Sequence, residues 1–379
     1  MKKAFSLFLI TALLFSLAAP CRAVEFSEEL NCRSAILIEA GSGTVLYEKN
    51  ADQPLPPASV TKIMTLLLVC EALDSGKVGL GDVVPVSENA SKMGGSQVYL
   101  KVGEEMTLQD MLKSVVVSSA NDCAVALAEY IAGSEIAFVS MMNEHAEKLG
   151  MKNTNFENVT GLDDTVKNHV SSARDIAIMS AELLKHAYIT QYTTIWMDTI
   201  RDGQFGLTNT NRLIRFYKGC NGLKTGMTAK AGYCVSATAE RGGMQLIAVI
   251  MGSPSRDIRN EAASRLLDFG FANYGVYSVK GEELPPLKLT GSLGSELKIR
   301  HGDFSVLLPS SDLREVIYET HLPDHAEAPL KEGDEIGRIE FFCRGKPVGE
   351  VAITACGDAP RIGYGAMLAR MLSHFLMLK

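Results

Sequence analysis

The stretch that follows Pro56-Pro57-Ala58 constrains the fold more than any other part of the sequence. Most positions of residues 59–73 are apolar, and Leu66, Leu67 and Leu68 follow one another directly. Such a segment suits a helix that other elements cover on several sides. The prolines end any extended structure before it. We therefore expect a buried helix with Ser59 at or near its N-terminus.

The pattern around this helix predicts an α+β domain. Strand-like runs lie near both ends of the domain, and helical periodicity fills the middle, which favours helices packed around an antiparallel sheet. A Gly41-Ser42-Gly43 turn joins the first two strands into a hairpin. The expected strands are 35–39, 44–47, 233–239 and 246–251, and the expected helices are 108–117, 123–131, 136–149, 173–184 and 261–269.

The sequence changes character at Pro285-Pro286, which we interpret as a domain boundary. Short β-type stretches divided by Gly, Pro and Asp follow, and they predict a small all-β module. The tail repeats apolar pairs at helical spacing and predicts an amphipathic helix. The expected divisions are a catalytic domain at 24–280, a β-rich domain at 285–360 and a helix at 361–379. The expected strands of the module are 304–308, 316–318, 339–342 and 348–354.

The N-terminus predicts export. Lys2 and Lys3 precede the apolar run 5–17, and a small-residue site ends at Ala23, so residues 1–23 have the pattern of a signal peptide. A membrane anchor is the alternative, but the run is shorter than the roughly 20 residues that a span requires. A lipoprotein attached at Cys21 is disfavoured by Pro20 directly before it.

Charge and cysteine content exclude several function classes. Loss of Lys2, Lys3 and Arg22 changes the net charge from −7 to −10, which disfavours a nucleic-acid partner. Seven cysteines remain, without a Cys-x-x-Cys pair, so we expect no zinc site, no other metal or cofactor and no essential disulfide. Cys123 lies in an apolar helical run and reads as a core thiol rather than a nucleophile.

The segment Ser59-Val60-Thr61-Lys62 carries the first sign of chemistry. Residues i and i+3 are neighbours on a helix surface, so the Ser59 hydroxyl and the Lys62 amine can meet. A buried lysine beside another cation has a lowered pKa and can accept the proton of a serine nucleophile. The helix N-terminus also directs N–H groups towards a developing oxyanion. Taken alone, the pattern also fits a capping serine with an exposed lysine.

Two further motifs make the pattern specific: Ser119-Ala120-Asn121 and Lys224-Thr225-Gly226. The order Ser-x-x-Lys, Ser-x-Asn, Lys-Thr-Gly resembles penicillin-binding proteins and serine β-lactamases. The surrounding stretches 57–64, 169–175 and 219–226 are similar to those of the low-molecular-mass D-alanyl-D-alanine carboxypeptidases. The resemblance covers nearly the whole mature chain, and the segments 219–234 and 268–271 are most similar to Gram-positive members, including those active in sporulation.

The resemblance implies a β-lactamase/transpeptidase-like catalytic domain and a serine acyl-enzyme mechanism. Ser59 would attack the carbonyl of the penultimate D-alanine, and Lys62 would take its proton. Ser119 and Lys224 would carry a proton to the departing D-alanine nitrogen. The product is a peptidoglycan stem shortened by one D-alanine.

The resemblance also assigns substrate-binding residues. Asn121 would hold the substrate amide, and the Lys224-Thr225-Gly226 motif would receive the terminal carboxylate. Arg259 matches the family's carboxylate-binding arginine, and Arg256 is the alternative. The interpretation without function is that either one is an exposed arginine at the start of a helix. The backbone N–H groups of Ser59 and Met227 would form the oxyanion hole.

This sequence departs from the family pattern at two positions near that motif. Asn221 stands where an acidic residue is common, and Met227 replaces more polar residues. Neither side chain lies on the implied proton path. We expect the second change to alter the pocket without removing activity.

Three functions remain open at this stage. A carboxypeptidase is expected, and a serine β-lactamase or a β-lactam sensor that stays acylated are the alternatives. The expected partners are peptidoglycan stem peptides, β-lactams as covalent inhibitors and the outer face of the cytoplasmic membrane, which the 361–379 helix would contact. The protein would act outside the cytoplasm in cell-wall maturation, with the spore cortex as one candidate site of action.

Overall fold

The computed structural model describes residues 26–376, so the expected signal peptide lies outside the described residues. The chain divides into a short N-terminal unit that ends at Leu30 and a large unit that begins at Asn31. The described residues of the short unit form no helix or strand. All the elements below belong to the large unit.

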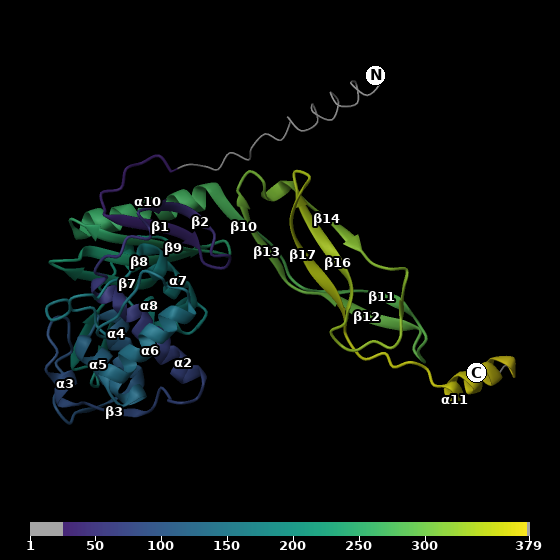
Figure 1. Cartoon of the computed structure of the whole chain (residues 1–379), viewed down its shortest axis with the longest axis horizontal. Coiled ribbons are helices and arrows are strands. Elements are labelled where there is room, and N and C mark those ends of the chain that lie inside the picture. Colours follow the sequence, from purple (N-terminus) through teal and green to yellow (C-terminus); the bar gives the residue numbers. More distant parts are fainter. Residues whose placement is uncertain (1–25, 377–379) are drawn as a thin grey trace, which may run out of the picture. The chain divides into compact units, whose positions relative to one another are not determined.

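A five-stranded antiparallel sheet forms the centre of the catalytic part (Figure 1). Its strand order is β2-β1-β9-β8-β7, so the first hairpin of the chain joins the sheet through β9. Every residue of β1 is buried beneath neighbouring parts of the chain. This burial explains the almost continuous apolar sequence of the strand. The bounds are β1 Ser34–Glu39, β2 Val45–Lys49, β7 Cys220–Thr228, β8 Gly232–Arg241 and β9 Met244–Ser253.

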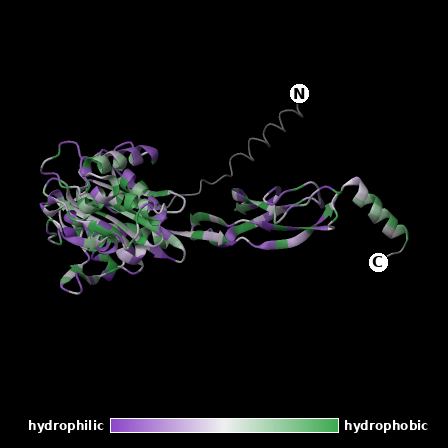
Figure 2. Ribbon diagram, turned by 90° about the horizontal axis from the view of Figure 1, so that it is seen from below, coloured by the Kyte–Doolittle hydropathy of each residue, from purple (hydrophilic) through white to green (hydrophobic). Residues whose placement is uncertain are grey.

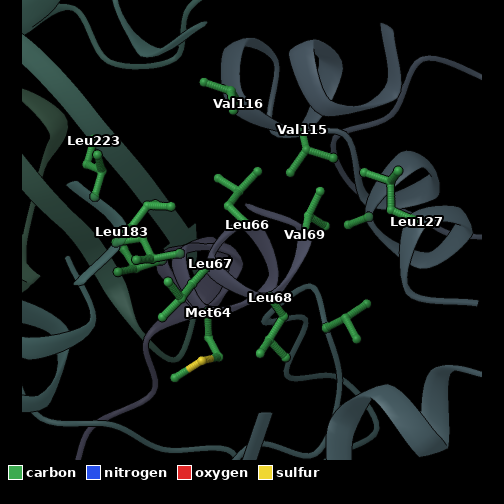
Figure 3. Packing of buried hydrophobic residues seen from close by; sticks show 14 of the residues in the cluster. Met64, Leu66, Leu67, Leu68, Val69, Val115, Val116, Leu127, Leu183 and Leu223 are labelled. Carbon is green, nitrogen blue, oxygen red and sulfur yellow. The ribbon is translucent and has the colours of Figure 1, made fainter. Parts of the chain in front are cut away.

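The predicted buried helix is α2, Lys62–Asp74, and it lies inside the largest hydrophobic core. Its residues from Lys62 to Cys70 are all buried. Figure 3 shows Leu66, Leu67 and Val69 of this helix among side chains from neighbouring elements. Burial of each such side chain contributes roughly 1.5–3 kcal/mol, so this packing holds the start of α2 in a fixed place.

The remaining helices and small hairpins complete the catalytic part. The predicted helices 108–117 and 173–184 are confirmed residue for residue, and the side chains of Thr107 and Ser172 cap them. The predicted helix 261–269 is longer than expected at both ends: Ser255 caps it, so that its polar first turn begins at Arg256, and it continues to Asn273. The bounds are α3 Glu88–Ser91, α4 Leu108–Val117, α5 Asn121–Ala132, α6 Glu135–Lys148, α7 Ala173–Leu184, α8 Ile189–Thr193, α9 Leu213–Phe216, α10 Arg256–Asn273, β3 Val83–Pro85, β4 Glu105–Thr107, β5 Met197–Ile200 and β6 Phe205–Thr208.

The C-terminal part is β-rich, as predicted. Strands β10 and β13 pair with each other, and the other six form a sheet in the order β14-β16-β17-β12-β11-β15. Its core includes Phe341 and Ile353, and the Phe304 ring stacks on Phe341 with centroids 3.9 Å apart. The bounds are β10 Tyr274–Val279, β11 Glu283–Thr290, β12 Glu296–His301, β13 Phe304–Pro309, β14 Val316–His321, β15 His325–Glu327, β16 Glu335–Cys343 and β17 Lys346–Ala355.

The Pro285-Pro286 pair lies inside β11 rather than in a linker. The register of β11 against β12 shifts between Leu284 and Leu287, so the two prolines occupy an irregular point of the pairing. Proline is tolerated there because no regular ladder bond requires its missing N–H. The strands β10, β11, β12 and β15 were not expected from the sequence.

The tail forms α11, Tyr364–Phe375. Several of its apolar side chains are exposed, and Figure 2 shows hydrophobic colour on much of this helix. Among residues 26–376 no single helix is long and apolar enough to cross a membrane. Helices α5 and α6, which meet at 84°, are together long and apolar enough, by length and composition alone. The exposed apolar residues of the tail are Met367, Leu368, Met371, Leu372, Phe375 and Leu376.

Candidate active site

The Ser59 hydroxyl lies at the entrance to α2. Ser59 belongs to a 3₁₀ turn, η1 Ala58–Thr61, and Lys62 is the first residue of α2. Lys62 Nζ donates to Ser59 Oγ over 3.0 Å and to the Thr160 carbonyl over 2.9 Å. The one-turn spacing therefore brings the two groups together as the sequence indicates.

The surroundings of Lys62 make its amine a base. The residue is completely buried, and burial lowers its pKa well below the usual range because a charged ammonium loses its water. The nearby charge of Lys224 lowers the pKa further, and Asp122 opposes this effect. A neutral amine beside the Ser59 hydroxyl can accept the proton of that hydroxyl.

Ser119 and Lys224 form a second bonded pair in the same place. Lys224 Nζ, from β7, donates to Ser119 Oγ over 2.9 Å. Ser119 lies in the turn between α4 and α5 with a φ of 61°, an unusual backbone conformation for a serine and one that often marks functional sites. Burial and the charge of Arg259 lower the pKa of Lys224 to about 7.

Strand β7 approaches the nucleophile closely because residue 226 is glycine. A Cβ atom on Gly226 would lie 2.9 Å from both the Pro57 carbonyl oxygen and the Ser59 nitrogen. The strand is at one edge of the sheet, and among residues 26–376 no strand pairs with its other edge. The next residue, Met227, has an exposed side chain, and Thr225 Oγ1 donates to Thr210 Oγ1 over 2.8 Å.

Asn121 presents an acceptor that has no partner. It is the first residue of α5 and is 1% exposed. Its Nδ2 donates to the Gly94 carbonyl over 2.6 Å, whereas Oδ1 is buried without a hydrogen-bond partner among the described residues. An unsatisfied buried acceptor costs about 1–3 kcal/mol, which a ligand N–H would recover.

A cavity of about 470 Å³ opens onto Ser59 and Ser119, whereas Lys62, Asn121 and Lys224 are buried and do not line it. Arg256 and Arg259 both line it, so both arginine candidates face the same space. Arg259 is buried, and its guanidinium donates to the Cys234 carbonyl over 3.3 Å, whereas Arg256 is exposed. Burial lowers the pKa of Arg259 to about 10. The expected site residues that line the cavity are Ser59, Ser119, Thr225, Gly226, Met227 and Arg259.

The sequence did not identify a further contact behind the nucleophile. Nδ1 of His169 accepts from the Glu157 N–H over 3.0 Å, so Nε2 carries the proton and donates to Thr61 Oγ1 over 2.8 Å. His169 stands in one of the stretches similar to the family, but no spacing rule links it to Thr61, which lies 108 positions away.

Residues 26–376 contain neither a group of side chains suited to a metal ion nor a disulfide. No group of three or more His, Cys, Asp or Glu side chains there could hold a metal ion. The seven cysteines of this part are free thiols. Burial raises the pKa of Cys123 well above the usual range, which leaves its thiol protonated and unreactive.

Known proteins match both parts of the chain. The D-alanyl-D-alanine carboxypeptidase family matches residues 21–255, and the C-terminal domain of penicillin-binding protein 5 matches residues 299–361. D-alanyl-D-alanine carboxypeptidase DacF of Bacillus subtilis is 40% identical over the full length of both chains.

Solved structures agree with this result. Penicillin-binding protein 5 of Haemophilus influenzae is 30% identical, with a TM-score of 0.74 over 89% of this chain and 100% of that one. Penicillin-binding protein D2 of Listeria monocytogenes, in an ampicillin-bound form, is 31% identical, with a TM-score of 0.60 over 65% of this chain and 100% of that one. The chain therefore belongs to the D-alanyl-D-alanine carboxypeptidase family.

Proposed function

We propose that this protein is a serine D-alanyl-D-alanine carboxypeptidase that uses Ser59 as its nucleophile and removes the terminal D-alanine of peptidoglycan stem peptides. The observation that carries this proposal is the 3.0 Å contact between Ser59 Oγ and the completely buried amine of Lys62. Ser59 lines a cavity that is also lined by Ser119 and by three arginines, Arg212, Arg256 and Arg259.

Acylation begins when Lys62 accepts the proton of Ser59. Oγ then attacks the carbonyl carbon of the penultimate D-alanine. The carbonyl oxygen becomes an anion and accepts from the N–H groups of Ser59 and Met227, each such donor contributing roughly 10²–10³ in rate. The close approach of Gly226 to the Ser59 nitrogen supports this pairing, because it brings the β7 backbone beside that N–H group.

The leaving group receives its proton through Ser119 and Lys224. The 2.9 Å bond between them forms a path towards the nitrogen of the departing D-alanine. The C–N bond breaks, and free D-alanine leaves. The proton held by Lys62 passes to Lys224, which restores both amines to their starting states. Water then attacks the ester on Ser59 while Lys62 takes the proton of the water, and Lys62 gives that proton to Oγ as the ester bond breaks, which releases the shortened peptide.

Recognition of the chain end makes the enzyme an exopeptidase. The terminal carboxylate lies against Thr225 and Arg259, which line the cavity and supply a hydroxyl and a positive charge. The buried ammonium of Lys224, bonded to Ser119, lies behind them and adds a second positive charge. Arg256 is the second candidate because it lines the same cavity. Oδ1 of Asn121 accepts from a substrate amide N–H and thereby gains the partner that it lacks.

The same serine reacts with β-lactams in our proposal. A related penicillin-binding protein has been crystallised with ampicillin. A β-lactam carries a carboxylate and a reactive carbonyl in place of the D-alanyl-D-alanine group, so it would use the same residues and remain bound to Ser59. Rapid hydrolysis of that ester would instead favour the β-lactamase function.

The compartment and domain divisions are also part of the proposal. Residues 1–23 direct export, and the part that follows, up to α10, carries catalysis. The β-rich domain extends from β10, which begins at Tyr274, to about residue 360, so it starts before the boundary that Pro285-Pro286 suggested. The exposed apolar residues of α11 support attachment of 361–379 to the outer face of the cytoplasmic membrane. Deletion of residues 361–379 should move the protein from the membrane fraction to the soluble fraction, and unchanged fractionation would contradict this attachment.

The central experiment compares the mature protein with Ser59→Ala. Both are incubated with diacetyl-L-lysyl-D-alanyl-D-alanine and with a fluorescent penicillin. D-Alanine release and labelling that both vanish in the variant would support the proposal. Labelling without release would favour the sensor, and absence of labelling in the wild-type protein would contradict the assignment of Ser59.

A further inference from the structure

Asp163 lies at the end of β7 that is farther from the carboxylate-binding residues. Its Oδ2 accepts from Thr228 Oγ1 over 2.6 Å, and Thr228 is the last residue of β7. Asp163 is half-buried and comes from the loop that also contains Thr160, whose carbonyl binds Lys62. This contact joins that loop to the end of β7, three residues beyond Thr225.

The Asp163 carboxylate is not neutralised by the protein. Among residues 26–376 no lysine or arginine forms an ion pair with it, although Lys167 and Lys230 are near it or near Thr228 in sequence. Both lysines are exposed. A negative charge beside the last residue of β7 is therefore available to a ligand cation.

The direction of the substrate follows from the proposed roles along β7. The terminal carboxylate lies at Thr225, and the carbonyl of the penultimate residue lies at the Met227 N–H. An extended peptide advances about 3.3 Å per residue along a free strand edge. The residue before the D-alanyl-D-alanine pair therefore lies beside Thr228, where Asp163 is bonded.

We propose that Asp163 binds the free side-chain amine of the residue that precedes the D-alanyl-D-alanine pair. This inference rests on the proposed function and specifies its substrate: peptides in which that residue is a diamino acid with an unmodified side chain. A lysine-like side chain carries an ammonium group on a flexible four-carbon stem, long enough to reach from the peptide backbone to a neighbouring carboxylate.

The contact distinguishes two states of the same substrate. A free amine is positively charged, whereas an acylated amine is neutral and bulkier, as it is when the side chain forms a cross-link. Asp163 therefore directs the enzyme towards stems whose side-chain amine is still free. The charge pair is partly exposed, so we expect an effect of about two- to fivefold on kcat/KM.

The test is a ratio of two rates measured on each protein. The substrates are Nα-acetyl-L-lysyl-D-alanyl-D-alanine and its Nα,Nε-diacetyl form, and D-alanine release gives kcat/KM for each. The wild-type protein should prefer the free amine by about two- to fivefold, and 0.5 M salt should reduce this preference. Asp163→Asn keeps an acceptor for Thr228, and its ratio should fall to about one, as expected when no carboxylate pairs with the amine.

Two further variants complete the design. Asp164→Asn removes the adjacent exposed carboxylate and should keep the wild-type ratio. Asp163→Lys should prefer an Nε-succinyl peptide, in which the side chain carries a carboxylate. Equal rates for the two substrates with the wild-type protein, or an unchanged ratio in Asp163→Asn, would overturn the inference. Release of D-alanine in either case would still support the proposed carboxypeptidase.

Discussion

Nε2 of His169 lies 2.8 Å from Oγ1 of Thr61, the residue directly before Lys62. The same loop bonds α2 through two more contacts, Thr160 O with Lys62 Nζ at 2.9 Å and Val159 O with Thr65 Oγ1 at 2.7 Å. The loop and the start of α2 therefore hold each other in place. The position of the base, Lys62, therefore depends on a segment that is about a hundred residues away in the sequence.

We expect His169→Ala to reduce the free energy of unfolding by about 3 kcal/mol. The change leaves the buried Thr61 hydroxyl without its partner and also removes the acceptor of the N–H of Glu157, an exposed residue. Chemical denaturation of the two proteins measures the difference. His169→Gln, which can still donate to Thr61, should lose less, and equal stability of all three proteins would contradict the structural importance of this contact.

His169 should also make stability depend on pH. Burial lowers its pKa from the usual 6.5 to about 4. Between these values the unfolded chain binds a proton that the folded protein does not, so stability falls as pH decreases from about 6.5 to about 4. The wild-type protein should lose about 3 kcal/mol more than His169→Gln across this range. Parallel pH profiles of unfolding for the two proteins would be inconsistent with a neutral buried histidine.

Lys62→Arg should reduce the acylation rate about 10²–10⁴-fold, the usual contribution of a general base. Arginine can still donate to Thr160, but it is always positively charged and its pKa is too high for it to accept the Ser59 proton. Stopped-flow labelling with a fluorescent penicillin measures the rate. An arginine variant with near wild-type acylation would show that Lys62 acts only by its charge.

Lys224 should set the alkaline limit of activity. Its pKa is about 7 in the free enzyme because it is buried near Arg259. The ammonium form is the one that pairs with the substrate carboxylate, so kcat/KM should fall as pH rises through about 7. In Lys224→Arg the arginine side chain stays charged over this pH range, so the decline of the remaining activity should move to higher pH. An unchanged pH profile would exclude Lys224 as the titrating group.

Gly226→Ala should impair acylation by 100-fold or more, because loss of one oxyanion donor alone has an effect of about 10²–10³. The added methyl group would meet the backbone of Pro57 and Ser59, and β7 would have to move away from the nucleophile. Gly206→Ala is the control, because a Cβ atom there meets no atom within 4 Å. Penicillin labelling of both variants, beside their unfolding curves, separates a local effect from loss of the fold.

The sequence predicts those parts of the fold that local patterns determine. Helices α4 and α7 follow from apolar periodicity and from capping residues, and the Ser59–Lys62 contact follows from helical spacing. Strand β12 was missed because only Leu297 and Ile299 are apolar in a short, otherwise polar segment. Strand β11 was missed because its two prolines are typical of a break.

The parts of the site that sequence reasoning could not reach are pairs distant in the chain. Lys224 and Ser119 are 105 positions apart, and only the similarity to a family suggested that they meet. His169 and Asp163 entered no prediction, since each depends on how one loop packs against α2 or β7. The choice between Arg256 and Arg259 stays open because both line the cavity.

Strand β7 has a free edge in the described residues, so the catalytic sheet is one strand short. Exposed strand edges promote association between chains, and proteins usually cover them. In this enzyme the missing strand would be supplied by each substrate molecule and would leave with each product. The sheet is then completed and reopened in every turnover, and a peptide that binds the edge but cannot be cleaved would act as a permanent sixth strand.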